Sequence, residues 1–121
     1  MYSSFQKNED EFHVYPDFWD DITANLLPIE AFNLFATELA RLYEKRFLDY
    51  EFCDFLINEA WSEWMFTFLE QNENIIPADF YEVYEAFDAG EYYRTNDKSD
   101  DPVADHTNPQ IKQFLERISK P

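Results

Sequence analysis

The sequence is poor in glycine and cysteine. Among its 121 residues there are one Gly and one Cys, Cys53. So few glycines argue against a β-sandwich with many tight turns and favour helices joined by short connections. A lone cysteine excludes an internal disulfide and fits a reducing compartment. No apolar run approaches the roughly 18 residues needed to span a bilayer, and the N-terminal residues lack the basic and apolar regions of a signal peptide. The expected location is the cytoplasm.

Positive charge is absent from a long internal stretch. Residues 47–93 contain no Lys, Arg or His, but they hold 12 acidic and 14 aromatic residues. Over the whole chain, 9 basic and 26 acidic residues give a formal net charge of −17. Unrelieved like charge repels itself in a compact domain, so we infer that this surface faces a cationic partner. Nucleic acid and anionic membranes are poor partners for such a protein, because both would repel it.

The apolar content is high enough for a folded domain. Hydrophobic residues make up 45% of the chain and aromatic residues 20%. We predict a single all-α domain over 1–121, a small bundle of about five helices. The expected helices are about 18–26, with Asp17 as N-cap, then 29–47, roughly 50–71, one that starts within 76–79 and ends before Gly90, and 109–119. Residues 1–16 are predicted to form an irregular or strand-like arm, and 91–108 an acidic loop. Gly90 is interpreted as a C′ residue, and Asn108 and Pro109 as the N-cap and first residue of the last helix.

The third and fourth helices carry most of the negative charge. By segment the net charge is 0 over 28–48, −7 over 49–74, −5 over 75–93 and +2 over 109–121. On the third helix, Cys53, Ile57, Ala60, Trp61, Trp64 and Phe68 share the predicted core side. Glu59, Glu63, Glu70 and Glu73 lie nearly opposite, with Phe52, Phe55 and Phe66 among or beside them. This arrangement is typical of a binding face, but other segments, such as the N-terminal arm, can equally cover those rings. On the fourth helix, Asp79, Glu82, Glu85 and Asp88 make the outer face acidic, with Tyr81 beside it.

No motif in the sequence indicates catalysis or a metal site. Asp97, Ser99, Asp101 and Asp105 have the spacing of a Ca²⁺ loop, but Pro102 and Asn108 replace the Gly and Glu that such a loop needs. His13, Cys53 and His106 are isolated, and a chain with one Gly has no phosphate-binding loop. With 26 acidic residues, any particular carboxylate pair is uninformative. We therefore expect no enzymatic activity, no cofactor and no metal.

Recognition by charge is the remaining class of function. Acidic stripes speed association with a basic partner, and aromatic anchors then slow its release. Three kinds of partner fit this pattern. They are a basic nuclease toxin, a DNA-binding defence protein inhibited by DNA mimicry, and a basic partner in an ordinary regulatory complex.

The C-terminal part of the chain resembles a known family. The segment from Tyr81 to Phe87 precedes an Asp-rich loop, and the helix from Ile111 to Ile118 then closes the chain. This layout is similar to the end of immunity proteins for tRNA-cleaving colicins. More broadly, it resembles the immunity proteins of bacteriocins and contact-dependent growth inhibition. The resemblance implies a tight one-to-one complex with a basic toxin domain, an RNase or a DNase, whose active site the protein occludes.

The predicted toxin-binding residues come from four segments. Carboxylates on the third helix, the turn after it and the fourth helix would mimic phosphates, two aromatic side chains would anchor the contact, and the loop would reach into the toxin cleft. These residues are Glu59, Glu63, Glu70, Glu73, Glu82, Glu85 and Asp88 as mimics, Phe66 and Tyr81 as anchors, and Tyr92, Tyr93, Asp97 and Asp101 in the loop. Reversal of Glu59 and Glu63 to Lys is expected to weaken association and leave the fold intact. The alternative hypothesis is a DNA-mimic inhibitor of a nuclease or restriction system, which would compete with duplex DNA for several unrelated basic proteins.

Overall fold

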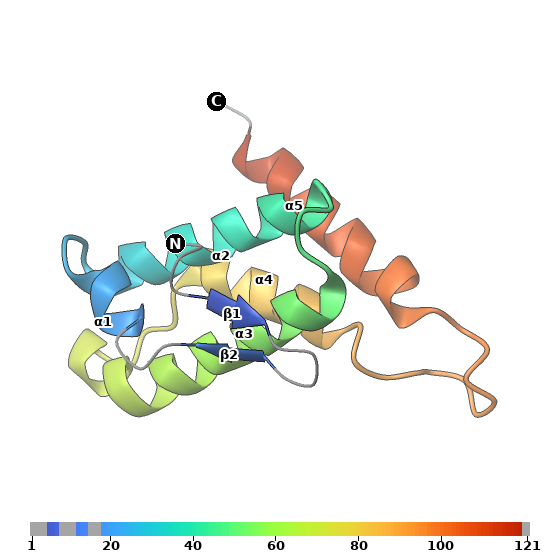
Figure 1. Ribbon diagram of the computed structural model, residues 1–121, viewed down its shortest axis with the longest axis horizontal. Coiled ribbons are helices and arrows are strands. Elements are labelled where there is room, and N and C mark those ends of the chain that lie inside the picture. Colours follow the sequence, from blue (N-terminus) through green and yellow to red (C-terminus); the bar gives the residue numbers. More distant parts are fainter. Residues whose placement is uncertain (1–4, 8–11, 15–17, 120–121) are drawn as a thin grey trace.

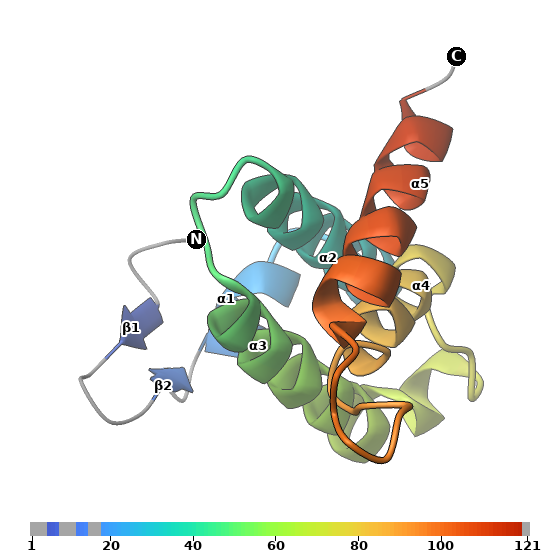
Figure 2. The same cartoon turned by 90° about the vertical axis from the view of Figure 1, so that its right-hand side faces the viewer.

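The protein is a small bundle of helices, as the sequence predicts (Figures 1 and 2). The computed structural model describes the backbone at residues 5–7 and 12–14 and the chain from 18 to 119. Its helices are α1 (Phe18–Thr23), α2 (Pro28–Glu44), α3 (Tyr50–Glu63), α4 (Ala78–Asp88) and α5 (Asn108–Ile118). The predicted all-α class is therefore confirmed. The first and second helices end earlier than expected.

The N-terminal arm contributes a short β-hairpin. Strands β1 (Phe5–Lys7) and β2 (Phe12–Val14) pair antiparallel, with Phe5 opposite Val14. Strand β2 contacts α3, and α3 lies between the hairpin and α4 in Figure 2. The rest of the arm and the predicted N-cap Asp17 lie outside the described residues.

The α2 helix is the centre of the bundle. It contacts α1, α3, α4 and α5. Its apolar residues recur at three- and four-residue spacing, so one face is buried from Ala31 to Ala40. Pro28 occupies the first turn, where a helix has no partner for the missing N–H. Cys53 of α3 is fully buried in the same core, as expected.

The core is built around the ring of Phe32. Its centroid lies 5.0 Å from that of Trp64, 5.4 Å from those of Phe68 and Phe80, and 5.5 Å from that of Trp19. These rings belong to α1, α4 and the segment after α3, so a single side chain of α2 joins four parts of the chain. Pairs at such separations add about 0.5–1.5 kcal/mol each to the free energy of burial.

The third helix does not continue as a regular α-helix to residue 71. A π-helical turn follows α3 at Trp64–Phe68, then a 3-10 turn at Glu70–Asn72. The wider turn places Trp64 and Phe68 in a stack with ring centroids 5.7 Å apart, so both reach Phe32. The Trp64 indole N–H also donates to the Ile75 carbonyl at 3.0 Å. Because a π turn adds a residue, the 100° spacing used to predict the faces stops applying after residue 63.

The last helical segment begins earlier than predicted. A π-helical turn at Val103–Thr107 leads directly into α5, and Asn108 has helical dihedral angles. The true N-terminal cap is Asp101, whose Oδ1 accepts the Ala104 N–H at 3.2 Å. Pro102 follows it, so the cap-plus-proline signal read at 108–109 also occurs seven residues earlier. The predicted loop 91–108 therefore ends near residue 101, and the cap assigned to Asn108 was wrong.

The C-terminal end of α4 is capped by side chains from other segments. The Tyr50 hydroxyl donates to the Phe87 carbonyl at 2.7 Å, and the buried Thr107 hydroxyl donates to the Ala86 carbonyl at 2.8 Å. Gly90 lies between these two side chains and does not adopt a positive φ. Gly90 occupies the predicted C′ position, directly after the C-cap residue Ala89, but close packing and not a left-handed conformation is what requires a glycine there. The capping hydroxyls come from positions 37 and 21 residues away from their acceptors.

None of the helices among the described residues combines the length and apolar character needed to cross a membrane.

Replacement of Gly90 by Ala tests this junction. The new Cβ would lie 2.4 Å from Thr107 Oγ1 and 2.9 Å from Tyr50 Oη, so one of the two caps must move. We expect Gly90→Ala to lower the free energy of unfolding by about 1–3 kcal/mol in chemical denaturation. In the Thr107→Ala background the loss of stability should be smaller, because Thr107 Oγ1, the atom nearest to the new Cβ, is gone. Equal losses in both backgrounds would contradict this explanation.

Candidate functional site

The predicted site residues Glu59 and Glu63 lie on a different side of α3 from the one that packs on α4. Trp61 packs against Phe80, Tyr81 and Tyr84 of α4. Glu59 and Glu63 are each two positions from Trp61, so helical geometry turns them about 160° away from the Trp61 side that packs on α4. Glu59 and Glu63 therefore do not share a face with the α4 carboxylates, whereas Asp54 of α3 lies near Asp88.

The three phenylalanines assigned to the acidic stripe have different environments. Phe52 is buried, Phe55 is half-buried against the core, and Phe66 in the π-helical turn is 90% exposed. Of the two readings that the sequence left open, coverage by other segments holds for Phe52 and in part for Phe55, and exposure holds for Phe66. Phe66 remains an anchor candidate, with Glu63 before it and Glu70 after it in the chain. Both Glu70 and Glu73 are exposed.

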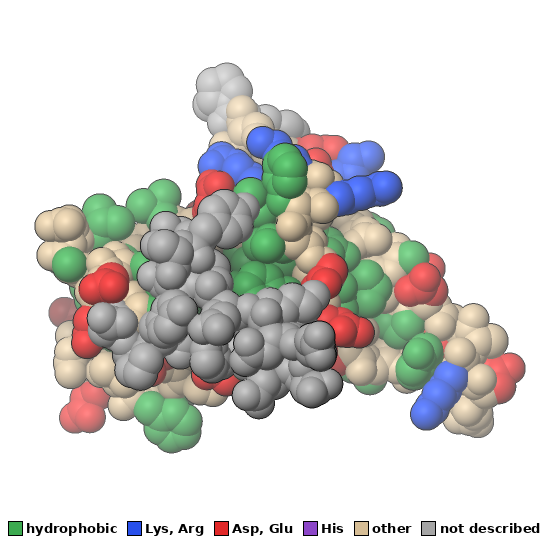
Figure 3. Space-filling view, in the orientation of Figure 1, with side chains coloured by type: hydrophobic (Ala, Val, Ile, Leu, Met, Phe, Trp, Pro, Cys, Tyr) green, Lys and Arg blue, Asp and Glu red, His purple; other side chains and the backbone are tan. Residues whose placement is uncertain are grey.

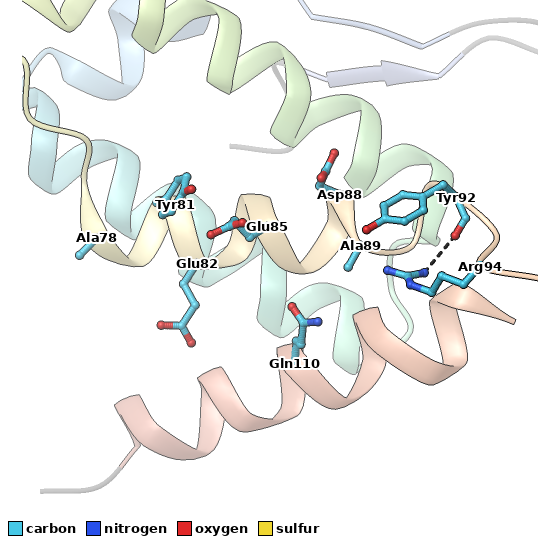
Figure 4. Close-up of a pocket in the computed structure, with 9 residues that line it drawn as sticks. All are labelled: Ala78, Tyr81, Glu82, Glu85, Asp88, Ala89, Tyr92, Arg94 and Gln110. Carbon is cyan, nitrogen blue, oxygen red and sulfur yellow. Dashed lines mark hydrogen bonds between the residues drawn. The ribbon is translucent and has the colours of Figure 1, made fainter.

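A groove runs along the outer face of α4, bordered by α5 and the loop after α4 (Figure 4). Its volume is about 580 Å³. Residues lining it include five predicted site residues: Tyr81, Glu82, Glu85, Asp88 and Tyr92. The structure thus brings together the α4 and loop parts of the prediction, and we take this groove as the candidate functional site.

A ladder of aromatic rings runs beside the groove. Trp61 and Tyr84 stack with centroids 4.2 Å apart and an interplanar angle of 10°, and Tyr84 in turn stacks on Tyr81 at 6.4 Å. Tyr81 is exposed, and the other two rings are half-buried. A hydrogen bond with Glu85 raises the pKa of the Tyr81 hydroxyl, so this phenol stays protonated over the physiological range. The ladder provides rigid, flat surface next to the carboxylates.

One wall of the groove is partly neutralised from within the chain. Arg117 of α5 lies 2.5 Å from Glu82 Oε1 and 3.8 Å from Asp79 Oδ1. The outer face of α4 is entirely acidic in sequence, but two of its four carboxylates have this internal partner in the structure. Glu85 and Asp88 carry the negative charge that remains. Burial, followed by the charges of Glu91 and Glu85, raises the pKa of the Asp88 carboxyl.

A second group of carboxylates, not found by the sequence analysis, fixes the base of the loop. Asn58 Nδ2 donates to Glu91 Oε2 at 3.0 Å, to Asp54 Oδ1 at 3.2 Å and to the Asp54 carbonyl at 2.8 Å. Burial raises the pKa of the Asp54 carboxyl to about 8, and hydrogen bonding to Glu91 and the charges of Glu91 and Asp88 act in the same direction. Asp54, Asn58 and Trp61 have the i, i+4, i+7 spacing of one helical stripe, and Trp61 of that stripe packs on Tyr84 of α4. The partner Glu91 is 33 residues from Asn58, a distance that local spacing does not reveal.

The loop 91–101 is held by its own polar contacts. Thr95 Oγ1 donates to Asp100 Oδ1 at 2.9 Å, and the Ser99 N–H donates to Asp97 Oδ1 at 3.1 Å. Hydrogen bonds to the ionised forms lower the pKa values of both carboxyls. Of the predicted loop residues, Asp97 stabilises the turn and Asp101 caps the following helix. In Figure 1 this loop extends away from the bundle, and Tyr92 and Tyr93 at its base are exposed.

Arg94 and Arg117 lie at the groove, whereas other basic side chains lie away from it. In Figure 3 they gather mainly at the top of the view, near α5 and the segment after α2, and acidic side chains are scattered over the rest of that face. Lys45, Arg46 and Lys112 form no ion pair within residues 18–119. This segregation agrees with the segment charges read from the sequence.

Neither a metal site among the described residues nor a related protein indicates what the groove does. Within the described residues, no three His, Cys, Asp or Glu side chains are grouped so that they could hold a metal ion. Comparisons with protein-family models, curated proteins and solved structures found no match. The case for a function therefore rests on the geometry of this chain.

The raised pKa of Asp54 makes a prediction about stability. The folded pKa of about 8 exceeds the ordinary value of 3.8, so between these pH values the folded protein holds a proton that the unfolded chain has lost. The free energy of unfolding should therefore fall as the pH rises from 5 to 8. After allowance for the partial exposure of this carboxyl, we expect a loss of about 2 kcal/mol. Asp54→Asn keeps a donor toward Glu91 and should flatten this decline, as measured by denaturation at several pH values.

Glu59→Gln is the matched control, since it removes one charge from α3 without touching the Asp54 cluster. It should keep the wild-type pH profile. Identical profiles for Asp54→Asn and wild type would show that this carboxyl is ionised in the folded protein.

The turn that precedes α4 stores backbone strain at a predicted site residue. Glu73 and Asn74 have φ values of 61° and 60°, in the left-handed region that costs an ordinary residue about 1 kcal/mol. Glu73→Gly should raise the free energy of unfolding by about 0.5–1 kcal/mol relative to Glu73→Ala, which removes the same charge but keeps the strain. Thermal denaturation of the two variants measures the difference. Equal stability of Glu73→Gly and Glu73→Ala would mean that a side chain at residue 73 causes no backbone strain.

Proposed function

We propose that this protein binds a basic protein through the α4 groove and acts as an immunity protein. In this proposal it neutralises a basic nuclease toxin domain in the cytoplasm by occluding the toxin's active site, and it performs no chemistry itself. The observation that carries the proposal is a groove that combines unneutralised carboxylates with exposed tyrosines, in a chain of net charge −17.

The chemistry of the groove suits the cleft of a nuclease. Such a cleft is built to bind phosphates and to stack on bases, so carboxylates and tyrosine rings match both of its preferences. Glu85 and Asp88 supply charge, and Tyr81 and Tyr92 supply flat apolar surface beside them. The field of the acidic surface would speed the encounter, and burial of the rings would slow dissociation.

The distribution of the acids favours occlusion of one cleft over mimicry of a DNA duplex. A duplex mimic needs carboxylates along one extended face, in place of the phosphates of a helix. Here Glu59 and Glu63 point to a different side of α3 from the groove, which interrupts any such row. The groove is compact and flanked by rings, which favours a single cognate partner.

Co-expression with the polypeptide encoded immediately upstream tests the proposal. If that polypeptide is the cognate toxin, it should kill cells alone, be harmless together with this protein, and co-purify with it. A neighbour that is harmless or does not bind would contradict the immunity function. Competition with duplex DNA for several unrelated basic proteins would then test the DNA-mimic hypothesis.

Charge reversals locate the contact within the same complex. Glu85→Lys with Asp88→Lys should weaken binding by about 100-fold or more, because each buried pair would become a repulsion. Glu59→Lys with Glu63→Lys makes the same charge change on the other side of α3 and should cost much less. Circular dichroism must show that both double variants keep their helices. A larger loss for the Glu59 and Glu63 variant would place the contact on α3.

A further inference from the structure

The groove already has a guanidinium group at its edge. Arg94 lines the groove, and its guanidinium carbon lies 4.2 Å from the centroid of the Tyr92 ring. Its Nη1 also donates to the Tyr92 carbonyl at 3.0 Å (Figure 4). Within residues 18–119 this guanidinium forms no ion pair, although three carboxylates line the same groove. The chain itself thus shows how a guanidinium stacks on this wall.

The carboxylates lie between two tyrosines along the groove. Figure 4 shows Glu85 and Asp88 between Tyr81 and Tyr92 along α4. They are three residues apart, so both project from nearly the same face of the helix. Like charges so close raise the free energy of the ionised pair, and the pKa of Asp88 is raised in part for this reason. A cation placed between them would relieve that repulsion.

We propose that the groove is a receptor for an arginine side chain of the basic partner, seated between the Glu85 and Asp88 carboxylates and stacked on Tyr92 in the place of Arg94. This inference rests on the proposed function and adds the chemical group that is recognised. Arginine is favoured over lysine because a planar guanidinium offers several donors to two carboxylates and stacks on a ring, whereas an ammonium is a compact, strongly hydrated charge.

Arg94 then acts as an internal competitor of the incoming arginine. Its backbone N–H donates to Asp100 Oδ2 at 2.9 Å, so the loop keeps its conformation when only the side chain turns away. The incoming arginine gains the two carboxylates that Arg94 does not reach.

Two capped tripeptides of equal charge test the inference. They are acetyl-Gly-Arg-Gly-amide and acetyl-Gly-Lys-Gly-amide, titrated against the full chain and followed by NMR through the tyrosine ring signals. The arginine peptide should bind more tightly by about threefold or more, as expected of a stacked guanidinium. Glu85→Gln with Asp88→Asn should abolish this preference. Glu59→Gln with Glu63→Gln, the matched control, should retain it.

Variants of the loop test the competition. Arg94→Ala should raise the affinity for the arginine peptide by about threefold beyond Lys98→Ala. Lys98 is the control because it removes one positive charge from the same loop, lies over Tyr93 at 5.8 Å and does not line the groove. Equal effects of the two variants, or equal binding of the two peptides, would overturn the inference. If the toxin still binds in that case, the proposed function stands without the arginine receptor; if no basic partner binds, the proposed function itself fails.

Discussion

The structure depends on the packing of aromatic rings around Phe32. Trp19, Trp64, Phe68 and Phe80 approach this ring from α1, the π-helical turn and α4, so its burial fixes how those segments meet. Within residues 18–119 the ion pairs involve only Arg41 and Arg117. Apolar burial therefore stabilises the fold, and surface charge is not needed for it. That division of roles allows α3 and the C-terminal half of α4 to carry negative charge that no internal cation neutralises within residues 18–119.

The same division explains why the groove is available to a partner. Where an internal cation does approach α4, it neutralises Asp79 and Glu82 near the start of the helix and leaves Glu85 and Asp88 toward its end. The end of α4 is also where Tyr50 and Thr107 cap the helix and where the loop begins. The unneutralised charge thus lies beside the junction that these two capping hydrogen bonds hold together.

Helical periodicity predicted the fold class, the number of helices and most buried positions, because spacing along the chain determines which residues share a face. It did not predict the π-helical turn at Trp64–Phe68, although Trp64 and Phe68 are buried and Phe66 is exposed as the spacing indicates. Periodicity also cannot show what covers a face, so it left open whether Phe52 and Phe55 are exposed; the structure buries Phe52 and half-buries Phe55. Of the site, the α4 carboxylates and Tyr92 were predicted together. Asp54, Glu91 and the capping role of Thr107 were missed, because their partners are distant in sequence.

The stack of Trp61 on Tyr84 has a spectroscopic consequence. Trp19 and Trp64 are buried in the core, whereas Trp61 is half-buried beside the groove and in contact with a tyrosine. Its indole is therefore the tryptophan that water and small quenchers reach most readily. The fluorescence emission of Trp61 is therefore sensitive to a molecule that binds at the aromatic ladder. The emission of the two core indoles changes when the protein unfolds. The chain carries separate built-in optical signals for occupancy and for folding, with no label to perturb either.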